Sequence, residues 1–276
     1  MQQTKSFKEL KTNARIQMQG NIGTLMGAML LQLGITIVVS NIVSNIVSGT
    51  DTASTVIYYV VMFIVELLLG TITAGMAYLH LKTACNGSAK IADMFYVIKA
   101  FPDKAIKIQL ILTIIGYIFS IPSYIFSYMY GGKFLSLYYS VLETSLLNSN
   151  ADVEGMLVNG TLSIIGNSTT LYFGLGLLLI VCGILSYIIR SLGFFPVYYM
   201  MLDFPGMSVS DIFKNAWELM KGYKARLFGL QLSFILYFVL SMFTMCIPLL
   251  WVIPYMSMTN TNFYLDLIAY KNGKSE

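Results

Sequence analysis

The stretch that decides the fold is "MKGYKARLFGLQL" at residues 220–232, because "MQGNIGTLMGAML" at residues 18–30 repeats its pattern. The two stretches lie 202 residues apart, and Met, Gly, Leu, Gly and Leu stand at matching positions in both. Each follows a polar, basic segment and runs into an apolar one. The pair therefore predicts an internal repeat, in which a basic segment precedes an apolar helix.

Long apolar runs make up most of the remaining sequence. The chain is 57% apolar and only 11% charged, whereas soluble domains carry about 25% charged residues. A bilayer core about 30 Å thick takes about 20 helical residues, and every run is that long. The sequence predicts an all-α, polytopic membrane protein, and we expect its first run to be a retained helix because it is longer than a signal-peptide core. The runs are residues 22–47, 56–79, 105–130, 171–202 and 227–256.

The basic residues predict the orientation and a sixth crossing. Positive charge collects on the cytoplasmic side of a membrane, and all four basic clusters reach that side only if an even number of crossings separates them. Pro248 interrupts the last run, and an interior proline breaks or kinks a helix. Splitting the run there gives crossings at 226–246 and 248–268, which makes six crossings with both termini in the cytoplasm. The clusters are residues 5–15, 82–107, 214–226 and 271–274.

Two parts of this topology are unusual in composition. The sixth crossing carries Ser, Thr, Asn and Asp between residues 257 and 266, so we expect it to face other helices or to lie partly in the interface. The segment 131–170 is the only sizeable loop expected outside, and apolar residues at 134–142 predict a short helix on the outer face.

Three apolar stripes at helical spacing precede the first, third and fifth crossings. Lysines back each stripe, which is the pattern of a helix that lies on a membrane surface. Glu9, Asp93 and Asp211 occupy the same place in each, where an acid also suits the positive end of a helix dipole. The stripes are Phe7, Leu10, Ala14 and Met18; Ile91, Met94, Phe95 and Ile98; and Val209, Ile212, Phe213 and Ala216.

The simplest account of these stripes is three copies of one unit, each with a surface helix, an outward crossing and a return crossing. The units are about 1–84, 85–202 and 203–276 within a single membrane domain, 1–276. Gly75 and Gly193 also align when the second and third stripes are superposed. The alternative is that the similarity does not reflect a repeat, because any two apolar helices that follow basic residues resemble each other.

Several segments resemble a family of bacterial integral membrane proteins known as domain of unknown function 975. The resemblance covers nearly the whole chain, although Tyr223 stands where we would expect Asn. It implies a multi-pass fold in the cytoplasmic membrane, without a known activity or catalytic residues. The architecture is also loosely similar to the non-catalytic membrane portion attached to some glycerophosphodiester phosphodiesterases. The segments are "IADMFYVIKAF" (91–101), "MLDFP" (201–205), "AWELMKGYKARLFGLQLSF" (216–234), "LLWVIPY" (249–255) and "NFYLDL" (262–267).

Residues that could carry catalysis are scarce. His80 is the only histidine, and its place near the end of the second crossing suggests an interfacial polar residue. The three cysteines lie far apart in apolar surroundings and predict inert side chains. We therefore expect no catalytic, metal or cofactor site, no enzyme activity and no nucleic-acid partner. A lipid-head-group enzyme is the least favoured class, because Asp203, Asp211 and Glu218 show no metal-ligand spacing.

Two charged residues lie inside the apolar runs, and charges within a membrane are functional candidates. Glu66 lies near the middle of the second crossing, and Arg190 lies near the cytoplasmic end of the fourth. An ion pair between them is one interpretation, and a proton-relay or substrate role for Glu66 is another. The interpretation that we favour is a structural polar contact from Glu66 to a neighbouring Tyr or Ser.

The predicted function is that of a non-enzymatic protein of the cell membrane, which acts as a scaffold, an accessory subunit, or an immunity or stress protein. Its expected partners are the lipid bilayer, with anionic lipids or another membrane protein. Lys214, Lys221 and Lys224 are the candidate residues for binding a membrane surface. The alternative class is a small transporter or channel, which internal repeats and buried charges favour.

Overall fold

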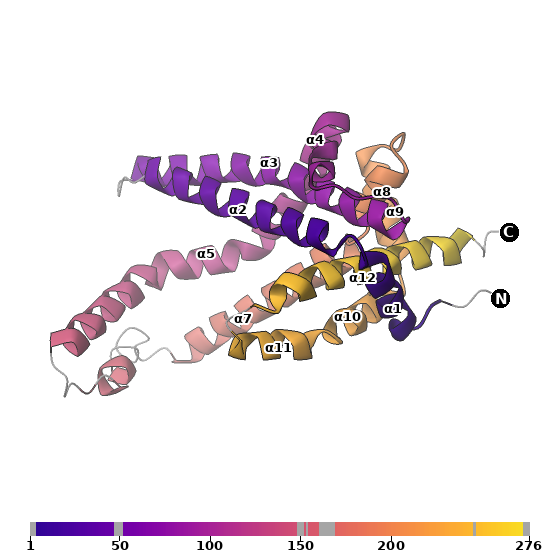
Figure 1. The fold of residues 1–276 in the computed structure, drawn as a ribbon. Helices are drawn as coiled ribbons and strands as arrows, with labels where there is room; N and C mark the ends of the chain where they lie inside the picture. Colours follow the sequence, from indigo (N-terminus) through magenta and orange to yellow (C-terminus); the bar gives the residue numbers. More distant parts are fainter. Residues whose placement is uncertain are drawn as a thin grey trace. The chain divides into compact units, whose positions relative to one another are not determined.

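The computed structural model describes residues 4–46, 52–147, 152, 154–159, 169–244 and 247–272. Within these ranges the chain is helical and has no strand, which confirms the predicted all-α class (Figure 1). The helices are α1 (Phe7–Met18), α2 (Ile22–Ile46), α3 (Thr52–Ala84), η1 (Ile91–Phe95), α4 (Tyr96–Ala100), α5 (Pro102–Leu147), α7 (Thr169–Tyr187), η2 (Ile188–Gly193), α8 (Val197–Asp203), α9 (Val209–Met220), α10 (Lys224–Leu232), α11 (Ile235–Phe243) and α12 (Leu249–Asn272).

Five helical stretches are long and apolar enough to cross a membrane, and each coincides with one of the predicted apolar runs. Most of their residues are not buried within the protein. Many large apolar side chains on them are exposed, such as Leu33, Ile64 and Ile180, and a bilayer would cover such surfaces. The stretches are Ile22–Ile46, Val56–Ala84, Pro102–Pro122, Leu177–Asp203 and Lys224–Ser241.

The chain folds into two compact units. The first comprises Met1–Thr113 and Arg190–Glu276, and the second comprises Ile114–Ile189. The second contains most of α5, which continues as one helix to Leu147 with Pro122 inside it. This corrects the expected loop from residue 131 and the separate helix at 134–142. The two glycines at 131–132 weaken a helix by only about 1 kcal/mol each, and the Leu- and aromatic-rich sequence around them continues α5.

The two stretches that repeat in sequence adopt the same local structure. The hydroxyl of Ser6 accepts from the amide of Glu9 at the start of α1, and the hydroxyl of Ser208 accepts from the amide of Asp211 at the start of α9. Both helices have 12 residues. Each ends in a type II turn, in which Gly20 has φ 84° and Gly222 has φ 86°. Glycine is suited to both positions because it adopts positive φ without steric cost.

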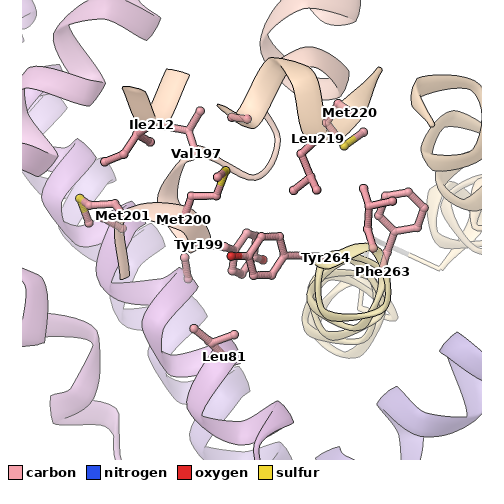
Figure 2. Packing of buried hydrophobic residues seen from close by; sticks show 14 of the residues in the cluster. Leu81, Val197, Tyr199, Met200, Met201, Ile212, Leu219, Met220, Phe263 and Tyr264 are labelled. Carbon is pink, nitrogen blue, oxygen red and sulfur yellow. The ribbon is translucent and has the colours of Figure 1, made fainter. Parts of the chain in front are cut away.

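The apolar faces of α1 and α9 are buried within the first unit. Leu10 and Ala14 of α1, and Ile212 and Ala216 of α9, are 0% exposed. Figure 2 shows the side chain of Ile212 in the same interior as Met200 and Tyr264. This corrects the prediction that these faces enter the membrane surface, because protein already surrounds them. The apolar face of an amphipathic helix can be buried either in a membrane surface or against protein. Its sequence therefore does not distinguish these two environments.

The middle stripe forms a shorter and less regular segment, η1 followed by α4. Met94 and Val97 are 0% exposed, whereas Ile91 and Ile98 are each 41% exposed. The stripe predicted from regular α-helical spacing is therefore only partly right, since η1 is a 3-10 helix. Lys82 of α3 forms an ion pair with Asp93 of η1 at 2.8 Å. Burial alone would raise the pKa of the Asp93 carboxyl, but hydrogen bonds from Lys82 and from the Lys90 amide hold it below its ordinary value.

The polar helix α12 is packed among α1, α2, α3, α10 and α11. It begins at Leu249, next to Pro248, and α11 ends at Phe243, so the predicted break in the last apolar run is confirmed. A further break at Ser233 and Phe234 separates α10 from α11. The polar residues of α12 face other helices, as expected from sequence. The buried ones are Thr259, Asn260, Thr261, Asn262 and Asp266.

Candidate functional site

A partly open cavity of about 300 Å³ is formed by residues of the first unit, and we call it the His80 cavity. Helices that are far apart in sequence contribute to its wall, so it exists only in the folded chain. Its lining is apolar and polar, without Asp, Glu, Lys or Arg. The residues are Met29 and Gln32 of α2; Thr73, Met76, Ala77 and His80 of α3; Phe195, Tyr198 and Tyr199 at α8; and Ile253, Pro254, Ser257 and Asn260 of α12.

His80 is buried and has a defined hydrogen-bonding state. Its Nδ1 atom lies 2.6 Å from the carbonyl oxygen of Met76, one turn earlier in α3. A carbonyl only accepts hydrogen bonds, so Nδ1 carries a proton. Burial disfavours the charged imidazolium, and in the neutral ring Nε2 is an acceptor. The side chain is 6% exposed, so protein surrounds it. Its expected position near the membrane interface stays a prediction. The register that pairs Gly75 with Gly193 also pairs His80 with Tyr198, another residue of the cavity wall.

Asn260 is the second notable group of the cavity wall. It is 9% exposed, and its Oδ1 atom is buried without a hydrogen-bond partner in the part of the chain that the structure describes. Leaving a buried polar atom unpaired costs about 1–3 kcal/mol. Asn260 also lines the cavity, so the wall contains a side chain whose hydrogen-bonding capacity the described chain does not satisfy.

A chain of hydrogen bonds joins the cavity wall to Glu66. The Tyr198 hydroxyl donates to Oε1 of Gln109 at 2.5 Å, and Nε2 of Gln109 donates to the Thr113 hydroxyl at 3.2 Å. That hydroxyl in turn donates to Oε1 of Glu66 at 3.2 Å. Gln109 lies against Gly70, where a Cβ atom would come within 2.3 Å of its Cγ. The glycine therefore allows α5 to place Gln109 between Tyr198 and Thr113.

The two intramembrane charges predicted as candidates do not form an ion pair with each other in the described structure. Glu66 accepts from Thr113, which is the kind of polar contact favoured from sequence, although the neighbour is Thr rather than Tyr or Ser. The ion pairs in the described residues are Lys82–Asp93 and Arg226–Asp266. Neither includes Glu66 or Arg190. Arg190 lies in η2, a π-helical turn that precedes α8.

The basic candidates lie on and just after α9, away from the cavity wall. Lys214 and Lys221 are exposed. The amine of Lys224 lies over the ring of Trp217, 3.0 Å from its centroid. The apolar face of α9 is buried, so only its charged outer face is available to a membrane surface. Their role in binding lipid stays a prediction.

Two of the acids considered for a lipid-head-group enzyme accept hydrogen bonds from hydroxyl groups. Asp203 accepts from the Tyr264 hydroxyl at 2.7 Å, and Asp211 accepts from the Ser208 hydroxyl at 2.6 Å. Within the described ranges, no three His, Cys, Asp or Glu side chains are grouped closely enough to hold a metal ion.

Sequence reasoning missed Tyr198, Gln109 and Asn260 as members of one site. Gln109 stands within an apolar run, and Asn260 lies in the polar part of the sixth crossing, so both carried a polar signal. Nothing in the sequence placed these residues next to His80, because they come from three different helices.

A family model described as "Protein of unknown function (DUF975)" matches residues 1–271. This match covers nearly the whole chain, and the chain belongs to that family. No curated protein and no solved structure matches it. The loose similarity to the membrane portion of glycerophosphodiester phosphodiesterases therefore stays a prediction.

Proposed function

Starting from that family membership, we propose that the chain is a non-enzymatic, multi-pass protein of the cell membrane that binds a small polar molecule in the His80 cavity. Asn260 of the cavity wall carries this proposal, because its Oδ1 atom has no hydrogen-bond partner within the described residues. Binding is favoured over catalysis because the wall has no carboxylate. The His80 ring is bound to a backbone carbonyl instead of the carboxylate that orients many catalytic bases.

The proposal includes six crossings and three repeats of about 1–84, 85–202 and 203–276. In each repeat the amphipathic segment packs on the last helix of the preceding one: η1 contacts α3, and α9 contacts α8. The contact of α1 with α12 would close this order into a ring. The last helices of the three repeats, α3, α8 and α12, each contribute to the cavity wall. This arrangement supports a shared binding site at the centre of the repeats.

The proposed orientation places both termini and all basic clusters in the cytoplasm. With the exposed Cys85 replaced by Ser, we expect Ser88→Cys and Ser210→Cys to react with a membrane-impermeant thiol reagent only from the cytoplasmic side. Both serines are exposed, so the fold does not block the reagent. Asn150→Cys, which lies outside the described residues, should react only from the outside. Reaction of Asn150→Cys from the cytoplasm would invert the topology.

A small transporter is the second candidate function, and the cavity favours it as well. A ligand site between α3, α8 and α12 would lie among proposed membrane crossings, where transporters bind their substrates. The three repeats would all begin on the same side, unlike the inverted repeats of many transporters. Ligand-dependent flux in proteoliposomes would support transport, and binding without flux would support the non-transporting protein.

Filling the cavity tests the proposed function directly. Ser257→Phe adds a ring to the cavity wall, and we expect it to abolish retention of a small molecule or lipid that native mass spectrometry detects on the wild-type chain. Ser44→Phe is the matched control, because Ser44 is exposed on α2 and outside the cavity wall. It should retain the molecule.

Two outcomes would contradict the proposed function. Equal retention by the wild type and by Ser257→Phe would show that the molecule binds elsewhere. A wild-type chain that carries nothing after gentle extraction, and that no small polar molecule stabilises against heat, would show that the cavity is not a binding site.

A further inference from the structure

We propose that the group bound in the His80 cavity is a primary ammonium group, carried by a small amine or by a lipid head group. This inference rests on the proposed function and names the ligand class for the same site. It follows from the hydrogen-bonding direction of three groups in the cavity wall. Each of them offers a lone pair.

The first two acceptors are His80 and Asn260. The Nδ1 proton of His80 is used on the Met76 carbonyl, at 2.6 Å, so Nε2 remains as an acceptor. The Oδ1 atom of Asn260 is buried and unpartnered in the described part of the chain. A ligand that reaches these atoms must bring a donor to each of them.

The third group is Tyr198, which begins the chain of hydrogen bonds that ends at Glu66. In that chain the Thr113 hydroxyl donates to Oε1 of Glu66. Thr113 then accepts from Gln109, whose carbonyl oxygen accepts the proton of Tyr198. Every donor in this chain is directed toward Glu66. The Tyr198 hydroxyl has therefore used its only proton, and its oxygen remains an acceptor.

A primary ammonium group matches this set better than other polar groups. It has three N–H donors and no acceptor, whereas a hydroxyl brings two lone pairs that would face the lone pairs of the wall. A quaternary ammonium has the charge without any donor. The lining residues include no Lys or Arg, although the charge of Arg190 in η2 acts on Tyr198. They also include Phe195 and Tyr199, whose ring faces attract a cation.

The same group could arrive from two sources, water or the bilayer. Ethylammonium is a soluble probe for the first source, and phosphatidylethanolamine carries the group into the membrane. Phosphatidylcholine is the matched lipid, because its quaternary head group has no N–H donor. The full chain in phosphatidylcholine nanodiscs is titrated with ethylammonium, ethanol or tetramethylammonium, and binding is followed by ligand-observed NMR. Thermal unfolding is then compared between nanodiscs with and without phosphatidylethanolamine.

We expect ethylammonium to bind at least about tenfold more tightly than ethanol or tetramethylammonium, as a hydrogen bond to a charged group predicts. Asn260→Leu should weaken ethylammonium by about tenfold or more. Asn260→Asp keeps the shape and adds a negative charge, so it should tighten binding of ethylammonium more than binding of ethanol. Asn41→Leu is the control: Asn41 is exposed on α2 and outside the cavity wall, and this variant should bind like the wild type.

The outcomes distinguish a soluble amine from a lipid as the source of the ammonium group. They also distinguish a failure of the ammonium assignment from a failure of the proposed function. Stabilisation by phosphatidylethanolamine that Asn260→Leu removes, without binding of ethylammonium, would support the group with a lipid as its source. Equal binding of ethanol or tetramethylammonium would overturn the ammonium assignment. So would the absence of any response to both amine sources. If Ser257→Phe still removed a bound molecule in either case, the proposed function would stand with a different ligand.

Discussion

Gly75→Ala is expected to destabilise the chain by about 3 kcal/mol, at the upper end of the cost of overpacking a core. A Cβ atom at Gly75 would lie 1.7 Å from the carbonyl oxygen of Met94 and 2.6 Å from its carbonyl carbon. Both are backbone atoms, so a change of side-chain rotamer cannot relieve the clash. The segment η1 would have to leave α3, and Met94, which is 0% exposed, would lose its buried position. Unfolding of the purified chain in mixed micelles, followed by circular dichroism, measures the change.

The matched control for this variant is Gly34→Ala. Gly34 lies within α2, and a Cβ atom there would have no heavy atom within 4 Å. Alanine is favoured over glycine in a helix by about 1 kcal/mol, so this variant should be equally stable or slightly more stable. If Gly75→Ala behaved like Gly34→Ala, the close packing of η1 on α3 would be wrong.

Asp266→Ala is expected to destabilise the chain by about 3 kcal/mol, because removing one partner of a buried ion pair leaves the other charge uncompensated. Oδ2 of Asp266 lies 3.1 Å from a guanidinium nitrogen of Arg226, and the two side chains are 7% and 18% exposed. The carboxylate also accepts from the backbone amide of Lys5 at 3.2 Å. One side chain of α12 thus binds both α10 and the segment before α1. Its loss should also make the sites around α1 more sensitive to trypsin.

A second variant distinguishes the charge effect from a general loss of packing. Asp266→Leu combined with Arg226→Met removes both charges, and it should be more stable than Asp266→Ala. Asp103→Ala serves as the control, because Asp103 is exposed in the first turn of α5. A double variant that was less stable than Asp266→Ala would show that the ion pair does not account for the cost. Unfolding in mixed micelles and the rate of trypsin cleavage measure both effects.

The sequence alone predicted the features that depend on local interactions. Five apolar runs became helices of spanning length, and the proline at 248 marked the break before α12. The two stretches that match in sequence also share a serine cap and a turn with glycine at positive φ, which the structure revealed. Caps and turns are formed by residues only a few positions apart. Such features can therefore be predicted from a short segment, without knowledge of the remaining chain.

Only the tertiary structure decided which surroundings each polar and amphipathic segment meets. The stripes of α1 and α9 suit lipid or protein equally, and the fold placed them against protein because α12 and α8 lie beside them. The polar residues of α12 found partners on other segments, as Asp266 did with Arg226. The His80 cavity depends on contacts between α2, α3, α8 and α12, which are distant along the chain. Composition and spacing describe one helix at a time, whereas a cavity is a property of how several helices pack.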